Sequence, residues 1–181
     1  MAPTAASSGS LPATVKFPER LQDPVLKALT PPDLWAEMQD SYKDYRRLGY
    51  FSAPERADLL RAASLKQWLF SGARFGIGTD NGVPLTFHTD ALWQLGKIYT
   101  NLGATPMWVI SSMTRVNAGI IGKQKEIGTL EPGKYADLVI VRGDPLDDLS
   151  ALANVETVIK NGAVYKGGLT LSFEGEKGQT K

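Results

Sequence analysis

Apolar residues recur at helical spacing in four stretches of the first 122 residues. The recurrence at i, i+3, i+4 and i+7 predicts helices over about 31–47, 52–71, 89–102 and 105–121. The residues on the apolar sides are Trp35, Met38, Tyr42 and Tyr45; Leu59, Ala63, Leu65, Trp68 and Leu69; Leu92, Leu95, Tyr99 and Leu102; and Ile110, Met113, Val116 and Ile120. We expect the aromatic stripe of the first helix to pack on the body of the protein, with the lining of a substrate pocket as the alternative.

Capping residues support these limits. Thr30 precedes Pro31, Ser52 and Glu55 are spaced as a capping box, and Thr105 precedes a first-turn proline. Each of the last three helices is followed by a glycine that favours a helix stop, namely Gly72, Gly103 and Gly122.

The period changes at two places from helical to extended. Residues 73–79 predict a short buried strand, in which Phe75 and Ile77 alternate with glycines. Residues 136–141 predict a strand that is buried on both faces or nearly so, because its apolar run is almost continuous. Two further β-prone runs, 155–160 and 163–166, flank Asn161-Gly162, a strong signal for a hairpin turn.

These elements divide the chain into four parts. Residues 1–10 are rich in Ala, Ser and Pro and predict a disordered lead-in, and residues 169–181 predict a flexible polar tail. Strand–helix units fill 11–122, whereas residues 123–168 predict a small antiparallel sheet. The fold class we expect is therefore α/β with an antiparallel portion at its end.

Composition narrows the classes of function. The chain has 181 residues, of which 43% are hydrophobic and 22% charged, with a formal net charge of +1. We therefore expect neither a nucleic acid nor a membrane as partner. There is no cysteine, and the first ten residues lack the pattern of a secretory signal. The expected location is the cytoplasm, because a chain without disulfides fits a reducing compartment.

Asp80 is the leading candidate for chemistry because it follows the predicted strand 73–79. Carboxylates at the carboxyl ends of buried strands face the crevice where α/β proteins bind ligands. A turn residue that caps its own loop is an equally valid interpretation from local sequence. A nucleotide loop is a poorer one, because Asn81 stands where the fingerprint needs its third glycine.

Four segments, in order, make the sequence resemble a known family. They are GTDNG at 78–82, HTDALWQLGKIYTNLGATPMWVISSMTRVNAGIIG at 88–122, IGTLEPGKYADLVIVRGDPL at 127–146 and VETVIKNGAVY at 155–165. Together they resemble the C-terminal part of the metal-dependent amidohydrolase superfamily, especially its imidazolonepropionase-like members. The resemblance implies the last two strands and helices of a (β/α)8 barrel, followed by part of a small β-sandwich.

The resemblance also implies a chemistry. The family hydrolyses mostly C–N bonds with divalent metal ions, zinc first among them, and acts on small molecules. Asp80 matches the family's residue that binds metal and acts as base toward the attacking water. Asn81, Gly82 and His88 would then contact substrate at the mouth of the barrel.

The metal site that the family uses is incomplete in this sequence. The family draws further ligands, including an H-x-H pair, from strands that precede the matched region. This chain holds one histidine, His88, and a catalytic zinc needs about three protein ligands. We therefore expect the chain alone to lack a complete metal site and to be inactive by the family mechanism. His88 has two other interpretations, a solvent-facing residue at a helix start and a substrate contact.

Two other clusters of charged residues have simpler interpretations. Lys134 and Asp137 could be mistaken for an acid–base pair, but their place in the third segment indicates a structural turn. Asp144, Asp147 and Asp148 could bind calcium weakly, although a solvated turn explains them better.

Three hypotheses of function remain. In the first, a complementing chain supplies the missing strands of a split enzyme. In the second, the chain is a non-catalytic binding or assembly module that covers its open edges in a homo-oligomer. The third is a new hydrolytic activity, for which the sequence offers neither a thiol nor a G-x-S-x-G elbow.

Overall fold

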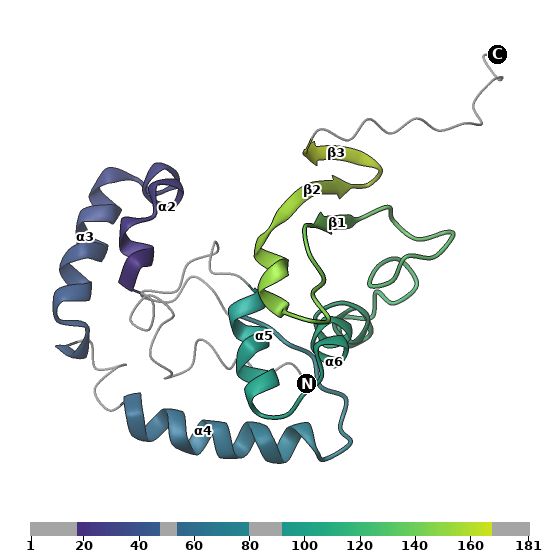
Figure 1. Cartoon of the computed structure of the whole chain (residues 1–181), viewed down its shortest axis with the longest axis horizontal. Helices are drawn as coiled ribbons and strands as arrows, with labels where there is room; N and C mark the ends of the chain where they lie inside the picture. Colours follow the sequence, from purple (N-terminus) through teal and green to yellow (C-terminus); the bar gives the residue numbers. More distant parts are fainter. Residues whose placement is uncertain (1–17, 48–53, 80–91, 168–181) are drawn as a thin grey trace.

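The computed structural model describes residues 18–47, 54–79 and 92–167 of the chain (Figure 1). The elements in order are η1 (Pro18–Gln22), α2 (Pro24–Leu29), α3 (Pro32–Lys43), η2 (Tyr45–Arg47), α4 (Pro54–Leu69), α5 (Leu92–Asn101), α6 (Pro106–Ser111), η4 (Ser112–Val116), α7 (Asn117–Ile120), β1 (Leu138–Val141), η5 (Leu149–Ala153), β2 (Val155–Lys160) and β3 (Ala163–Lys166). The expected lead-in, the flexible tail and Ser52 of the capping box lie outside the described residues.

The helix predicted over 31–47 is confirmed as α3 with η2 after it, but its capping residue differs from the prediction. Asp23 caps an earlier helix, α2, by accepting bonds from the N–H groups of Val25 (2.8 Å) and Leu26 (3.2 Å). The Thr30 hydroxyl donates back to the carbonyl of Leu26 (2.7 Å), so Thr30 ends α2 and does not cap α3. Thr30 stands between α2 and α3, and the sequence pattern predicted a cap for the wrong one of these two helices.

The helix predicted over 105–121 is present but irregular. Thr105 caps α6 as predicted, accepting from the N–H of Trp108 (3.2 Å). A π-turn, η4, then interrupts the helix before α7 resumes. The predicted inward position Ile120 is 39% exposed, whereas Ala118 is buried. The extra residue of a π-turn rotates the following side chains, which the sequence spacing did not reveal.

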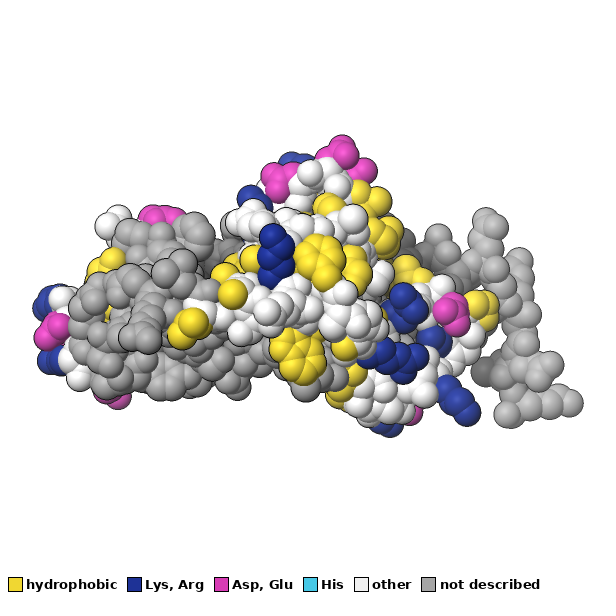
Figure 2. Space-filling model, turned by 90° about the horizontal axis from the view of Figure 1, so that it is seen from below, with side chains coloured by type: hydrophobic (Ala, Val, Ile, Leu, Met, Phe, Trp, Pro, Cys, Tyr) yellow, Lys and Arg dark blue, Asp and Glu magenta, His cyan; other side chains and the backbone are white. Residues whose placement is uncertain are grey.

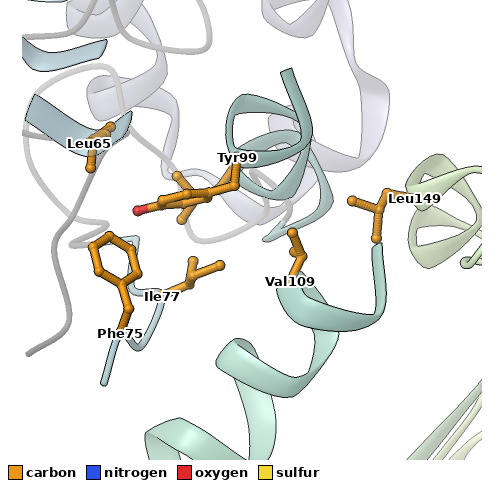
Figure 3. Packing of buried hydrophobic residues seen from close by; sticks show 7 residues of the cluster. Leu65, Phe75, Ile77, Tyr99, Val109 and Leu149 are labelled. Atoms are coloured by element: carbon orange, nitrogen blue, oxygen red, sulfur yellow. The ribbon is translucent and has the colours of Figure 1, made fainter. Parts of the chain in front are cut away.

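The main core lies between the helices and the segment 73–79. It is formed by buried side chains from α4, from that segment, from α5, from α6 and from η5, namely Leu65, Phe75, Ile77, Leu95, Tyr99, Val109 and Leu149 (Figure 3). Phe75 and Ile77 are buried as predicted, but residues 73–79 form no strand. An extended segment becomes a strand only when a neighbour pairs with it, and no described strand lies beside it.

The sheet is antiparallel and has the order β1-β2-β3. The predicted hairpin is confirmed, since Asn161 (φ 50°) and Gly162 (φ 78°) both adopt the positive φ that a two-residue type I′ turn requires. β1 is not buried on both faces as predicted: Val139 is 57% exposed. Within the described residues no second layer covers that face.

Among the described helices, none is both long and apolar enough to cross a membrane.

Candidate functional site

The four residues predicted to carry the chemistry, Asp80, Asn81, Gly82 and His88, lie outside the described residues. Their roles therefore stay predictions. The structure does describe the frame on both sides of them, because segment 73–79 ends just before Asp80 and α5 begins at Leu92.

An aromatic cluster holds the first side of that frame. The ring of Phe75 meets Tyr99 edge to face, with centroids 5.6 Å apart, and lies 5.7 Å from the ring of Trp108. Tyr99 and Trp108 are themselves 6.1 Å apart. Edge-to-face pairs of this kind add to the free energy gained from burial alone. The segment before Asp80 is thus fixed on α5 and α6 (Figure 3).

Tyr99 is fully buried in this cluster. Burial raises the pKa of its phenol well above the ordinary value, because the phenolate would lose its hydration. Tyr99 therefore remains a neutral phenol at physiological pH and is unsuited to act as a general base.

A polar contact fixes the same segment from the opposite helix. The side-chain amide of Asn117, the first residue of α7, donates to the carbonyl of Ile77 (2.7 Å) and to that of Met113 (3.3 Å). Sequence analysis missed Asn117. A signal was present, since this polar residue stands four positions after Met113 on the side of the helix predicted to face inward.

The charged pair that sequence analysis set aside is separated in the structure. Lys134 bonds to the hydroxyl of Thr129 and pairs with Glu131 (3.5 Å). Asp137 instead pairs with Lys160 and accepts from the N–H of Asn161 (2.7 Å). Both residues stabilise turns, in agreement with the structural interpretation.

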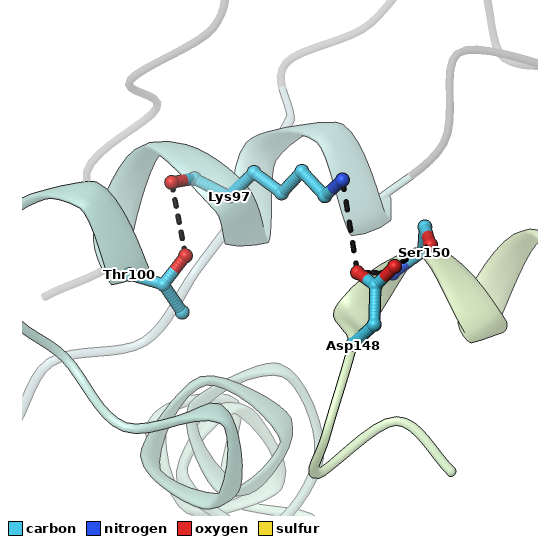
Figure 4. A network of polar contacts seen from close by, with 4 residues as sticks. All are labelled: Lys97, Thr100, Asp148 and Ser150. Carbon is cyan, nitrogen blue, oxygen red and sulfur yellow. Dashed lines mark hydrogen bonds and ion pairs between the residues drawn. The ribbon is translucent and has the colours of Figure 1, made fainter.

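The acidic residues 144–148 also serve local structure. Asp144 accepts from the N–H of Leu146 (2.8 Å). Asp148 caps η5 through the N–H of Ser150 (2.9 Å) and pairs with Lys97 of α5 (3.7 Å; Figure 4). Hydrogen bonds to Ser150 lower the pKa of Asp148 most, with a smaller contribution from Lys97. The expected solvated turn fits this geometry.

Within the described ranges, no group of three or more His, Cys, Asp or Glu side chains could hold a metal ion. The described residues alone therefore offer no complete site for the divalent metal that the resemblance implies.

Comparison of sequences relates the chain to a known family. The model of the amidohydrolase family matches residues 58–165. An imidazolonepropionase from Clostridium tetani (strain Massachusetts / E88) is 37% identical over 95 residues, which make up 50% of this chain and 21% of that protein. The match thus spans about a fifth of the length of this curated relative.

The chain is also similar to solved structures of several hydrolases. A Xaa-Pro dipeptidase with bound methionine in its active site is 31% identical, with a TM-score of 0.58 over 63% of this chain and 27% of its own. Phenylurea hydrolase B is 27% identical, with a TM-score of 0.52 over 57% of this chain and 26% of its own. An amidohydrolase of 22% identity shares the fold over 93% of this chain and 35% of its own, with a TM-score of 0.60. Since the family model matches more than half of its residues, the chain belongs to the amidohydrolase family.

Proposed function

We propose that this chain is the C-terminal part of an amidohydrolase that hydrolyses a C–N bond in a small-molecule amide or cyclic amide. The observation that carries the proposal is the family match over 58–165, which spans Asp80 and the GTDNG segment. The proposed architecture is the last units of a (β/α)8 barrel with part of an adjoining β-sandwich. The shared fold over 93% of the chain with an amidohydrolase supports it.

Asp80 is the proposed general base. Its carboxylate takes a proton from the attacking water and returns it to the leaving nitrogen, a task that needs a positioned group with a suitable pKa. Asn81, Gly82 and His88 contact the substrate at the barrel mouth. The names of the relatives define three substrates to test: imidazolonepropionate, a phenylurea and an Xaa-Pro dipeptide.

The family implies a divalent metal ion, with zinc as the first choice, and Asp80 as one ligand. Such an ion lowers the pKa of bound water to about 7. With one histidine and no cysteine, the sequence supplies too few ligands for a catalytic zinc. We propose that polypeptide outside this sequence supplies the others, that this chain alone is inactive, and that the reaction takes place in the cytoplasm.

The experiment is elemental analysis of metal content per chain for wild type, Asp80→Ala and the control Asp33→Ala. Asp33 is an exposed acid in the first turn of α3, far from Asp80 in sequence. Each protein is measured alone and mixed with a polypeptide that carries the family's H-x-H segment. We expect near-stoichiometric zinc, manganese or iron in the mixtures that contain wild type or Asp33→Ala, together with hydrolysis of one of the three substrates. We expect the mixture that contains Asp80→Ala to lose the metal. Equal metal in all three proteins, or none in any mixture, would contradict the proposal.

A second candidate is a non-catalytic assembly module, and exposed apolar side chains favour it. The large ones that are more than half exposed are Val25, Leu29, Leu60, Phe70, Met107, Ile121, Leu130, Tyr135, Val139 and Tyr165. Figure 2 shows apolar side chains beside Lys and Arg on one face of the molecule. Where such side chains form a contiguous surface, they favour cover by another chain. A defined homo-oligomer in sedimentation, with neither metal nor hydrolysis after complementation, would support this candidate over the first.

A further inference from the structure

The contact between Asn117 and Ile77 joins residues that are 40 positions apart in the chain. Residues 73–79 belong to no helix or strand, so no ladder of backbone bonds holds them in the described structure. The Asn117 amide donates to the Ile77 carbonyl at 2.7 Å, as the N–H of a neighbouring strand does in a sheet. The Asn117 side chain thus supplies a hydrogen bond that a neighbouring strand would otherwise donate.

The π-turn η4 sets the direction in which the Asn117 side chain leaves the helix. An α-helix turns by about 100° per residue, and a π-turn adds one residue, which rotates all later side chains back by about 100°. Asn117 stands eight positions after the buried Val109. The rotation places Asn117 about 20° from the direction of Val109, whereas an uninterrupted helix would place it about 80° away. The irregular turn therefore brings the amide to the side of the helix that packs on the core.

Gly76 allows the close approach. A Cβ atom at this position would lie 2.6 Å from Cδ1 of Ile120 and closer still to Oδ1 of Asn117. The requirement is for space, because Gly76 is not among the glycines with positive φ. The segment and the helix therefore fit together only with glycine at 76 and with Asn117 in its present orientation.

We propose that Asn117 is a positioning residue, which fixes the main chain at the point where it leads into Asp80. The inference rests on the role of Asp80 given under Proposed function. Asp80 follows Ile77 by three residues in the sequence, so the carbonyl that Asn117 holds comes shortly before Asp80 along the chain. A displacement of about 1 Å in a reacting group can reduce a rate about a hundredfold.

The first test is hydrogen exchange of the full chain, read on peptides that cover 75–80. Asn117→Ala leaves the Ile77 carbonyl without its donor, and we expect exchange there to become about tenfold faster. The matched control is Thr114→Ala, which removes a side-chain bond to the carbonyl of Ile110 (2.7 Å) on the same helix. Equal exchange in the two variants would overturn the inference.

The second test separates positioning from general stability. Zinc affinity of the complemented protein is measured by competition with a chelator for wild type, Asp80→Ala, Asn117→Ala and Val109→Ala. Val109 is buried in the core, so Val109→Ala lowers stability without removing the Asn117 amide. We expect Asn117→Ala to weaken zinc binding about tenfold more than Val109→Ala does at equal loss of Tm.

The outcomes are distinguishable. If zinc binding depends on Asp80 but Asn117→Ala weakens it no more than Val109→Ala, the inference is wrong and the proposed function stands. If zinc binding does not depend on Asp80, the proposed function fails. The exchange comparison then decides by itself whether Asn117 holds the chain at 75–80.

Discussion

The Asp137 carboxylate accepts a hydrogen bond from the N–H of Asn161 at 2.7 Å, which ties the chain before β1 to the turn between β2 and β3. Lys160 pairs with the second oxygen of the same carboxylate. A further bond runs from the N–H of Gly162 to the carbonyl of Ala136 (3.0 Å). The hairpin turn is therefore fixed on the segment that precedes the sheet.

This relationship predicts a pH dependence of stability. The Lys160 pair first, and then the Asn161 N–H, hold the pKa of Asp137 below its usual range. A carboxyl group whose pKa is lowered in the folded state stabilises the fold at pH values above its ordinary pKa, near 3.8. This stabilisation is lost as the pH falls through the pKa of the folded state. We expect Asp137→Ala to lower Tm at neutral pH by about 2 °C and to flatten the fall of Tm below about pH 4. Asp147→Ala, in an exposed turn, should leave the Tm profile unchanged.

A double-mutant cycle measures the fit between Gly76 and Asn117. Gly76→Ala forces a Cβ against the amide, and overpacking of this kind costs about 1–3 kcal/mol. Asn117→Ala leaves a buried carbonyl unpaired, at a cost of about 1–3 kcal/mol. Removal of the amide relieves its own part of the clash and leaves the contact with Ile120, so the double variant should be more stable than the sum predicts by about 1 kcal/mol. Denaturant unfolding gives the four free energies, and additive costs would contradict the close approach.

Tyr99 should resist ionisation in the folded protein. Burial raises the pKa of Tyr99, so the folded state favours the neutral phenol. The free energy of unfolding therefore falls as the pH rises above the ordinary tyrosine pKa, near 10. We expect wild type and Tyr99→Phe to give the same tyrosinate absorbance while folded and to differ by one tyrosine once alkali unfolds them. A difference that appears before unfolding would disprove the prediction. Tyr99→Ala should cost about 3–5 kcal/mol.

The open face of the sheet should govern association. Val139 on β1 is 57% exposed, and a charge there meets solvent in the isolated chain. We expect Val139→Lys to change the free energy of unfolding by less than about 0.5 kcal/mol and to weaken self-association measured by sedimentation. Leu29→Lys, at an exposed position on α2, is the control that should leave association intact. Equal effects of the two variants would argue against the sheet as the contact surface.

What the sequence predicted well is local. Thr105 and the pair Asn161-Gly162 act through neighbours within a few positions, and the structure confirms both. Strand formation at 73–79 depends on a partner far away in sequence, so an alternating pattern could predict its burial but not its pairing. The π-turn has no signature in composition, which is why the spacing predicts an inward position for Ile120 that the structure does not show.

The chemistry could be predicted only by resemblance. No pattern around Asp80 distinguishes a general base from a turn residue, because both need a carboxylate at the end of an extended segment. The family match over 58–165 includes that carboxylate and the segments at 78–82 and 127–146, and the role proposed for Asp80 depends on it. Asp80 and His88 remain predictions.

Leu149 belongs to η5, which lies between β1 and β2, yet its side chain is part of the core formed by the helices and segment 73–79. Helices and sheet are therefore coupled, and we expect a single cooperative melting transition. Tryptophan fluorescence, to which Trp108 beside the core contributes, and circular dichroism should report the same midpoint. A partner that binds the sheet would then also change the stability of segment 73–79, which precedes Asp80 in the sequence.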